Sequence, residues 1–131
     1  MLPRRRPVAL KRVREAASPA HRLRVLVDRL WPRGLAKDQV VMDLWLKDVA
    51  PSSSLRSWYG HDPERWHGFG LKYRAELAQR ADLLQLLDDL RHRGTLTLLS
   101  DAKDTMHSHA IVLREAIIDR HQVGARPCAL G

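Results

Sequence analysis

Residues 23–34, with the sequence LRVLVDRLWPRG, decide the predicted fold. The first part, residues 23–30, is an apolar run rich in β-branched side chains and predicts a buried strand. Pro32 cannot donate a hydrogen bond to a neighbouring strand and holds the preceding residue extended, so we expect the strand to stop near Leu30. The strand thus leads directly into polar and aromatic side chains. This pattern is typical of a binding site, because ligands of α/β sheets lie beyond the carboxyl ends of the strands.

The length and composition indicate one soluble globular domain. A chain of 131 residues can bury a hydrophobic core of its own, and 44% hydrophobic with 29% charged residues is an ordinary globular composition. No apolar run approaches the roughly 20 residues that span a bilayer, and no apolar segment follows the first arginines. We therefore expect no membrane partner and no secretory signal. The single cysteine, Cys128, permits no internal disulfide, and we expect a cytoplasmic protein.

The formal net charge of +8 belongs to the first quarter of the chain. Residues 1–33 contain ten lysines and arginines against two carboxylates, whereas the remaining residues are balanced. We expect residues 1–7 to form a basic flexible tail and residues 124–131 a short C-terminal tail of a single domain that spans residues 1–131. Such a basic segment can attract nucleic acid or polyphosphate, or it can be a solvated end. Both interpretations stay open.

The periodicity of apolar residues predicts alternating strands and helices. Strands are expected over residues 8–13, 23–30 and 95–99, and helices over residues 37–49, 63–77, 82–92 and about 105–121. Residues 50–54, APSSS, are expected to end the first helix, and residues 55–62 to be irregular. Gly68 and Gly70 each weaken the second helix by about 1 kcal/mol relative to alanine. The order of elements predicts a small three-layer α/β domain with a short, largely parallel sheet flanked by helices.

Two strand ends carry similar polar side chains, DRLW at residues 28–31 and SDAKD at residues 100–104. If the two strands are parallel neighbours, both segments meet at one edge of the sheet. We expect Arg29, Arg33 and Lys103 to hold an anionic group there, a phosphate or a carboxylate. Free backbone N–H groups near Thr105, at the start of the last helix, would add to this site. The alternative is a structural ion-pair network among the charged residues of the two segments.

His107 is the candidate for proton transfer, because an unperturbed imidazole titrates near neutral pH. Asp104 or Asp28 would orient it, and His61 is a second candidate. A helix-cap or core role is an equal alternative for either histidine. Together with His109 these histidines also suggest a metal-binding protein, but two positions on a helix that are two apart point away from each other. No HExxH motif or cysteine pair is present, so we assign no metal ligand.

The aromatic residues of the first half divide into two groups. Trp45 and Trp66 lie at apolar helical positions and are expected in the core. Trp31 and Trp58 adjoin polar residues and are expected to wall a pocket. Aromatic side chains interleaved with arginine can also stack on bases, which favours a nucleic-acid-binding module as an alternative function.

Five segments resemble the YeaO-like family, within the domain of unknown function 488. They are RVLVDRLWPRG at 24–34, LWLKDVAPS at 44–52, LRSWYGHDPERW at 55–66, YRAEL at 73–77 and TLLSDAKDTMHSHAIVL at 97–113. The resemblance covers about residues 24–118 and implies a single α/β domain without specifying an activity. This chain departs from the family pattern at Ser100 and Asp101 and near Gly68 and Gly70. The family pattern falls on Asp28, Arg29, Trp31, Pro32, Arg33, Gly34, Lys47, Trp58, Gly60, His61, Asp62, Tyr73, Lys103, Asp104, His107 and His109.

Three functions follow as alternatives. The first is an enzyme-like, anion-binding pocket at the carboxyl ends of the strands, for a small anionic or phosphorylated molecule. The second is a non-catalytic nucleic-acid-binding module, and the third a metal-binding protein that uses His61, His107 and His109. Neither a cofactor nor an oligomeric state is predicted. For the first function the catalytic candidates are His107, Asp104 and Asp28, and the ligand-binding candidates are Arg29, Trp31, Arg33, Trp58, His61, Lys103 and His109.

Overall fold

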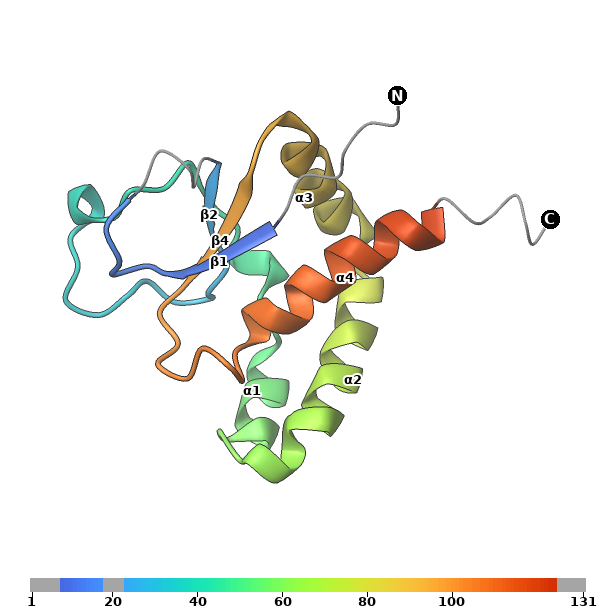
Figure 1. Ribbon diagram of the computed structural model, residues 1–131. Coiled ribbons are helices and arrows are strands. Elements are labelled where there is room, and N and C mark those ends of the chain that lie inside the picture. The colour runs from blue at the N-terminus through green and yellow to red at the C-terminus, as the bar shows by residue number, and fades with distance from the viewer. Residues whose placement is uncertain (1–7, 18–22, 125–131) are drawn as a thin grey trace.

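A computed structural model describes residues 8–17 and 23–124 and shows a small sheet beside a group of α-helices (Figure 1). The tail expected at residues 1–7 and most of the tail expected at residues 124–131 lie outside the described residues. No helix in the described part is both long and apolar enough to cross a membrane. The elements are β1 (Val8–Arg12), β2 (Arg24–Leu26), η1 (Lys37–Gln39), β3 (Leu44–Trp45), η2 (Lys47–Val49), α1 (Ser53–Tyr59), η3 (Pro63–Arg65), α2 (Trp66–Ala78), α3 (Ala81–Arg93), β4 (Leu96–Ser100) and α4 (His109–Gly124).

The four described strands form one parallel sheet in the order β1-β4-β2-β3. Strand β4 lies between β1 and β2, with Val8 opposite Leu96 and Val25 opposite Leu98. The two short strands β2 and β3 pair through Val25 with Leu44 and Leu26 with Trp45. The α/β class and the parallel sheet expected from the sequence are confirmed.

All four α-helices contribute to one core on the same face of the sheet. Because side chains alternate along a strand, Leu96 and Leu98 of β4 face this core, together with Val25 of β2. The helices cover them with residues that are almost completely buried, such as Tyr73 of α2 and Leu113 of α4. We call this side of the sheet the helix face.

The other side of the sheet, the loop face, has a smaller core. Leu26 and Leu99 point to it from β2 and β4 and pack with Val13 and Val40. Trp31 and Trp45 border this core, and their ring centroids lie 5.4 Å apart in an edge-to-face arrangement. Loop segments and the short η1 turn therefore form the third layer, and the α-helices all lie on the first.

The helix expected over residues 37–49 is wrong. This segment contains η1, the edge strand β3 and η2, and Val41, placed by the spacing on the apolar helical face, is 58% exposed. The segment forms a strand and not a helix because its backbone makes hydrogen bonds to a distant part of the chain. The backbone N–H of Leu46 donates to the carbonyl of Leu26 at 2.8 Å. The indole N–H of Trp45 also donates to the carbonyl of Asp28 at 2.8 Å.

A helix, α1, forms where the sequence predicted a break and an irregular stretch. The hydroxyl of Ser52 accepts a hydrogen bond from the backbone N–H of Leu55 at 3.1 Å, which caps the first turn. Gly60 ends the helix in the left-handed conformation, with φ of 52°. The serine run thus starts a helix. Asp62 caps the following turn, because its carboxylate accepts from the N–H of Glu64.

Two further boundaries differ from the expected ones and shape the candidate site. Strand β2 ends at Leu26, four residues before the expected end. Helix α4 begins at His109, so residues 101–108 form a loop in place of the expected first helical turns near Thr105. Both changes lengthen the irregular segments that follow the two central strands.

Replacing either of the two glycines of α2 by alanine should change the stability in opposite directions. A Cβ on Gly70 would meet its nearest neighbour, Cγ2 of Val112, at 3.9 Å, which is ordinary contact. We expect Gly70→Ala to raise the free energy of unfolding by up to about 1 kcal/mol, because alanine favours the helix. A Cβ on Gly68 would lie 2.9 Å from Cη2 of Trp58. We expect Gly68→Ala to lower the stability by about 1–2 kcal/mol through overpacking. Urea denaturation of both variants measures this, and equal gains would contradict the packing of Trp58 on Gly68.

Candidate functional site

The two polar strand ends lie side by side, as expected from the sequence. Strands β2 and β4 are parallel neighbours, and the N–H of Val27 donates to the carbonyl of Leu99 at 3.0 Å. Beyond this bond, Oδ2 of Asp28 accepts from the backbone N–H of Asp101 at 2.7 Å. The carboxylate of the first segment therefore holds the backbone of the second.

Asp28 also lies beside His109, the first residue of α4. The Nε2 atom of His109 is 3.0 Å from the carbonyl of Val27 and 3.4 Å from Oδ1 of Asp28. Burial lowers the pKa of His109, and the nearby Asp28 carboxylate opposes this shift only in part. A neutral imidazole with its proton on Nε2 fits the Val27 carbonyl as its acceptor. His109 thereby attaches the start of α4 to the end of β2.

The second histidine of the predicted site has a different carboxylate partner. Nδ1 of His107 lies 2.9 Å from Oδ2 of Asp104, while Oδ1 of Asp104 accepts from the N–H groups of Met106 and His107. The hydrogen bond from His107 is the main cause of a lowered pKa of Asp104. Of the two carboxylates expected to orient His107, Asp104 contacts it, and Asp28 contacts His109. The His107 ring also lies edge-on to Trp66, with centroids 5.2 Å apart.

His61 and His107 both contact one group of aromatic side chains, His61 through Tyr59 and His107 through Trp66. It follows Gly60 and has a φ of 59°, in the left-handed region that side chains rarely adopt. Its ring centroid is 6.1 Å from that of Tyr59, which in turn lies 6.0 Å from Trp66. Burial raises the pKa of Tyr59, with smaller contributions from Asp104 and Asp62. The loop after α1 and the loop after β4 therefore meet at Tyr59 and Trp66.

The other predicted binding residues are distributed over several places. Arg29 donates to the carbonyls of Ala50 and Pro51 at 3.3 and 3.4 Å, on the side of α1. Arg33 and Lys103 are exposed. In the described residues, no contact joins these three cations to one another.

The two tryptophans expected to wall the site contact other parts of the fold. Trp31 donates its indole N–H to the carbonyl of Leu35 at 2.6 Å and packs in the loop-face core. Trp58 lies between α1 and α2, where the Arg65 guanidinium and the Lys72 ammonium lie 5.1 and 4.9 Å from the ring centroid. Its predicted role at the ligand stays a prediction.

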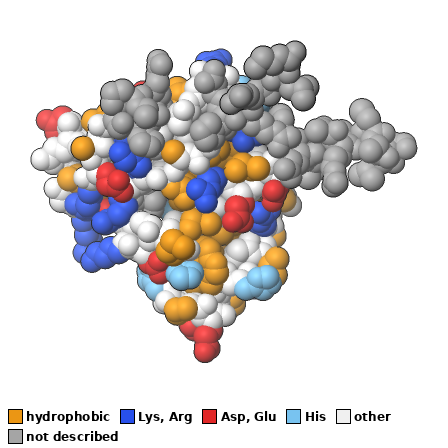
Figure 2. Space-filling model, viewed as in Figure 1, with side chains coloured by type: hydrophobic (Ala, Val, Ile, Leu, Met, Phe, Trp, Pro, Cys, Tyr) orange, Lys and Arg blue, Asp and Glu red, His pale blue; other side chains and the backbone are white. Residues whose placement is uncertain are grey.

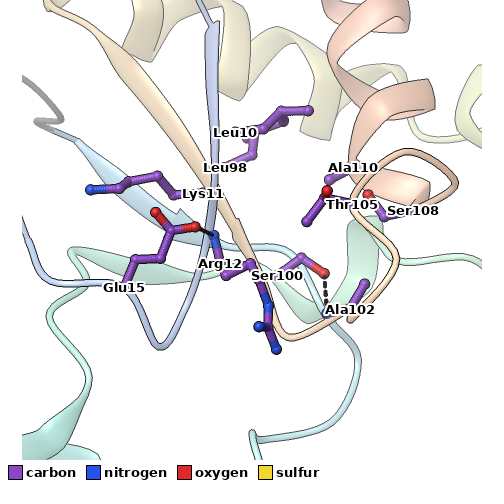
Figure 3. Close-up of a pocket in the computed structure, with 10 residues that line it drawn as sticks. All are labelled: Leu10, Lys11, Arg12, Glu15, Leu98, Ser100, Ala102, Thr105, Ser108 and Ala110. Atoms are coloured by element: carbon purple, nitrogen blue, oxygen red, sulfur yellow. Dashed lines mark hydrogen bonds between the residues drawn. The ribbon is translucent and has the colours of Figure 1, made fainter.

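A pocket of about 200 Å³ opens at the carboxyl ends of β1 and β4, on the helix face (Figure 3). We call it the β1–β4 pocket. The site expected from the sequence lies where β2 and β4 end, and none of the side chains predicted for that site lines the β1–β4 pocket. Its polar lining comes from three parts of the chain: Lys11, Arg12 and Ser100 at the ends of the two strands, Glu15 in the turn after β1, and Thr105 and Ser108 in the loop before α4. Its apolar lining includes Leu10, Leu98 and Ala110.

Arg12 has an unused donor at this pocket. Its Nε atom is buried and has no hydrogen-bond acceptor among the described residues. Ser108 is 8% exposed, and the hydroxyl of Ser100 accepts from the N–H of Ala102 at 3.1 Å. The sequence contained a signal for Arg12 that we did not use. It stands at the end of an expected strand, like the residues of the two strand ends already chosen.

The described residues contain no group of three or more histidine, cysteine, aspartate or glutamate side chains that could hold a metal ion. His107 and His109 contact different carboxylates, as described above. The described part of the chain therefore offers no set of ligands that supports the metal-binding alternative.

The lowered pKa of His109 predicts a pH dependence of stability. Below about pH 6.5, the ordinary value for histidine, the unfolded chain binds a proton that the buried imidazole does not. The free energy of unfolding should therefore fall as the pH drops from 7.5 towards 5. His109→Gln should make this fall shallower, whereas His67→Gln, on the exposed side of α2, should leave it unchanged. Urea denaturation across this pH range measures both, and equal slopes for wild type and His109→Gln would contradict the burial argument.

Comparison with known proteins agrees with the resemblance seen in the sequence. Residues 7–127 match the family DUF488-N3i, described as the inactive DUF488-N3 subclade. The chain is 42% identical over 113 residues to the uncharacterized protein Rv3073c of Mycobacterium tuberculosis, covering 86% of this chain and 95% of that protein. It is 39% identical over 108 residues to the uncharacterized protein YeaO of Escherichia coli, covering 82% and 94%. No solved structure is significantly similar to it. The chain therefore belongs to the DUF488 family, as a YeaO-like member.

Proposed function

We propose that this protein binds a small phosphorylated molecule in the β1–β4 pocket and does not transform it. The observation that carries the proposal is the buried Nε of Arg12, which has no acceptor among the described residues although it lies at a pocket. A buried donor without a partner is unfavourable, and a bound anion would supply the acceptor.

The polar lining of the β1–β4 pocket suits phosphate oxygens. A guanidinium and hydroxyl groups all donate hydrogen bonds, and phosphate accepts several at once. Thr105 and Ser108 come from the segment that leads into α4, and the positive end of the helix dipole lies at the start of α4. Figure 2 adds that basic side chains gather on the side of the sheet and its loops, which attracts anions.

The size of the pocket limits the ligand. Its volume of about 200 Å³ is smaller than the roughly 300–1,000 Å³ usual for pockets of drug-sized molecules. A phosphate group with a short organic part fits this description better than a dinucleotide. The nucleic-acid alternative depends largely on the basic N-terminal segment, whose first seven residues lie outside the described residues.

Binding without turnover is supported by the chemistry of the lining. The lining has no histidine or cysteine among the described residues, and its one carboxylate, on Glu15, accepts from the backbone N–H of Arg12 at 3.1 Å. The description of the matched subclade as inactive points the same way. In this proposal the Asp104–His107 and Asp28–His109 pairs position the loop and the helix. A catalytic role for His107, Asp104 or Asp28 stays a prediction.

Inorganic phosphate provides a direct test of the proposal. Titration of the labelled protein, followed by amide NMR shifts, should give saturable changes at residues 98–110. Arg12→Gln should weaken phosphate binding at least tenfold, because one charge-assisted donor is worth about 1.5–3 kcal/mol. Arg93→Gln, which removes an exposed arginine at the far end of α3, is the matched control and should bind as the wild type does.

Two results would overturn the proposal. One is equal phosphate affinity of wild type and Arg12→Gln. The other is the absence of a saturable response to phosphate combined with tight, salt-sensitive binding of a short single-stranded oligonucleotide, which would favour the nucleic-acid alternative.

A further inference from the structure

A second pocket lies on the loop face of the sheet. Its volume is about 240 Å³, and it is bounded by the turn after β1 and by the segment around η1. The β1–β4 pocket lies on the helix face, so the sheet and the turn at Glu15 separate the two. The site already described uses none of its inner polar groups.

Arg24, the first residue of β2, is the inner charged group of this second pocket. It points to the loop face because it alternates with Val25, which faces the helices. Its residue is only 4% exposed, and its Nε donates to the carbonyl of Val41. Because Val41 also lines the pocket, this bond places the guanidinium at the pocket wall.

The charge on Arg24 has no ion-pair partner in the described part of the chain. The carboxylate of Asp43 accepts from the backbone N–H of Arg24 at 2.7 Å and not from its guanidinium. The Nη1 atom is buried and has no acceptor among the described residues. A buried, unpaired guanidinium is strongly unfavourable, so this arrangement suits an anion that enters the pocket.

The other polar groups of the pocket indicate the charge of that anion. Arg14 also lines it, but its guanidinium is already bound to the carboxylate of Asp101 at 2.7 and 3.1 Å. Gln39 uses its amide oxygen to accept from the N–H of Ala36, which leaves its NH2 group as a donor. The carboxylate of the exposed Glu15 also lines the pocket and offsets part of its positive charge. One unpaired cation and a neutral donor match a singly charged group.

We propose that this Arg24 pocket binds a small monocarboxylate with an apolar body. The planar guanidinium of Arg24 matches the geometry of a carboxylate, and Gln39 offers a second donor. Val13, Leu35 and Val41 provide apolar walls for a short hydrocarbon chain. This site is independent of phosphate binding in the β1–β4 pocket.

Sodium butyrate is the probe for this site, used with the full-length protein. Amide NMR titration should give saturable shifts at residues 13–17 and 35–41, and sodium chloride at equal ionic strength should not. Arg24→Gln should reduce butyrate affinity at least tenfold, and Lys37→Gln, an exposed change in η1, should leave it unchanged. Arg12→Gln should also leave butyrate binding unchanged, which separates this site from the proposed phosphate site.

A second variant keeps the test valid if Arg24→Gln does not fold. Val41→Trp alters a side chain that is 58% exposed yet lines the pocket, so it should fill the space without removing a buried charge. We expect Val41→Trp to abolish the butyrate shifts while its spectrum stays dispersed. Butyrate binding that survives in Val41→Trp, shifts confined to residues 98–110, or no saturable response of the wild type would each overturn the proposal.

Discussion

The structure depends on Asp28, whose backbone and side chain connect three elements. Its carbonyl accepts the indole N–H of Trp45 in the edge strand β3, and its Oδ2 accepts the N–H of Asp101 after β4. Its Oδ1 has no hydrogen-bond partner among the described residues and lies 3.4 Å from Nε2 of His109 at the start of α4. A carboxylate in this position needs its partners, because a half-satisfied buried charge is costly. Asp28 therefore fixes where the β4–α4 loop leaves the sheet, and so the shape of the carboxyl edge.

The β4–α4 loop, held in this way, presents different chemistry on its two sides. Thr105 and Ser108 line the β1–β4 pocket, whereas Asp104 and His107 form a pair that lies against Trp66. The N–H bonds accepted by Asp104 keep the loop in one conformation without a regular helix or strand. A loop positioned by a rigid sheet commonly carries the binding residues of a fold. This division also explains why histidines prominent in the sequence do not line the pocket beside them.

The sequence predicted most elements that depend on a local pattern of residues. It missed an element that depends on hydrogen bonds to distant segments. The strands β2 and β4 follow from their apolar runs, whereas the sequence left open whether the two strands are neighbours. The helix predicted over residues 37–49 was wrong, because the helical spacing of apolar residues does not reveal a strand pairing. Leu44 and Trp45 pair with Val25 and Leu26 in the sheet. Helix α1 was not predicted for a local reason: the segment APSSS favours a break, but Ser52 within it caps a helix. The strand ends were placed together correctly, and the roles assigned to their residues stay predictions.

The sequence places Arg12 near the end of an expected strand, but which pockets Arg12 and Arg24 line depends on the strand order. With β1 beside β4, Arg12 projects to the helix face at the start of a pocket, and Arg24 projects from β2 to the loop face. Each guanidinium keeps one buried nitrogen without an acceptor in the described residues, at a cost of about 1–3 kcal/mol for each donor. The anion binding proposed for the two pockets would supply the missing acceptors, and it requires no catalytic group in either pocket.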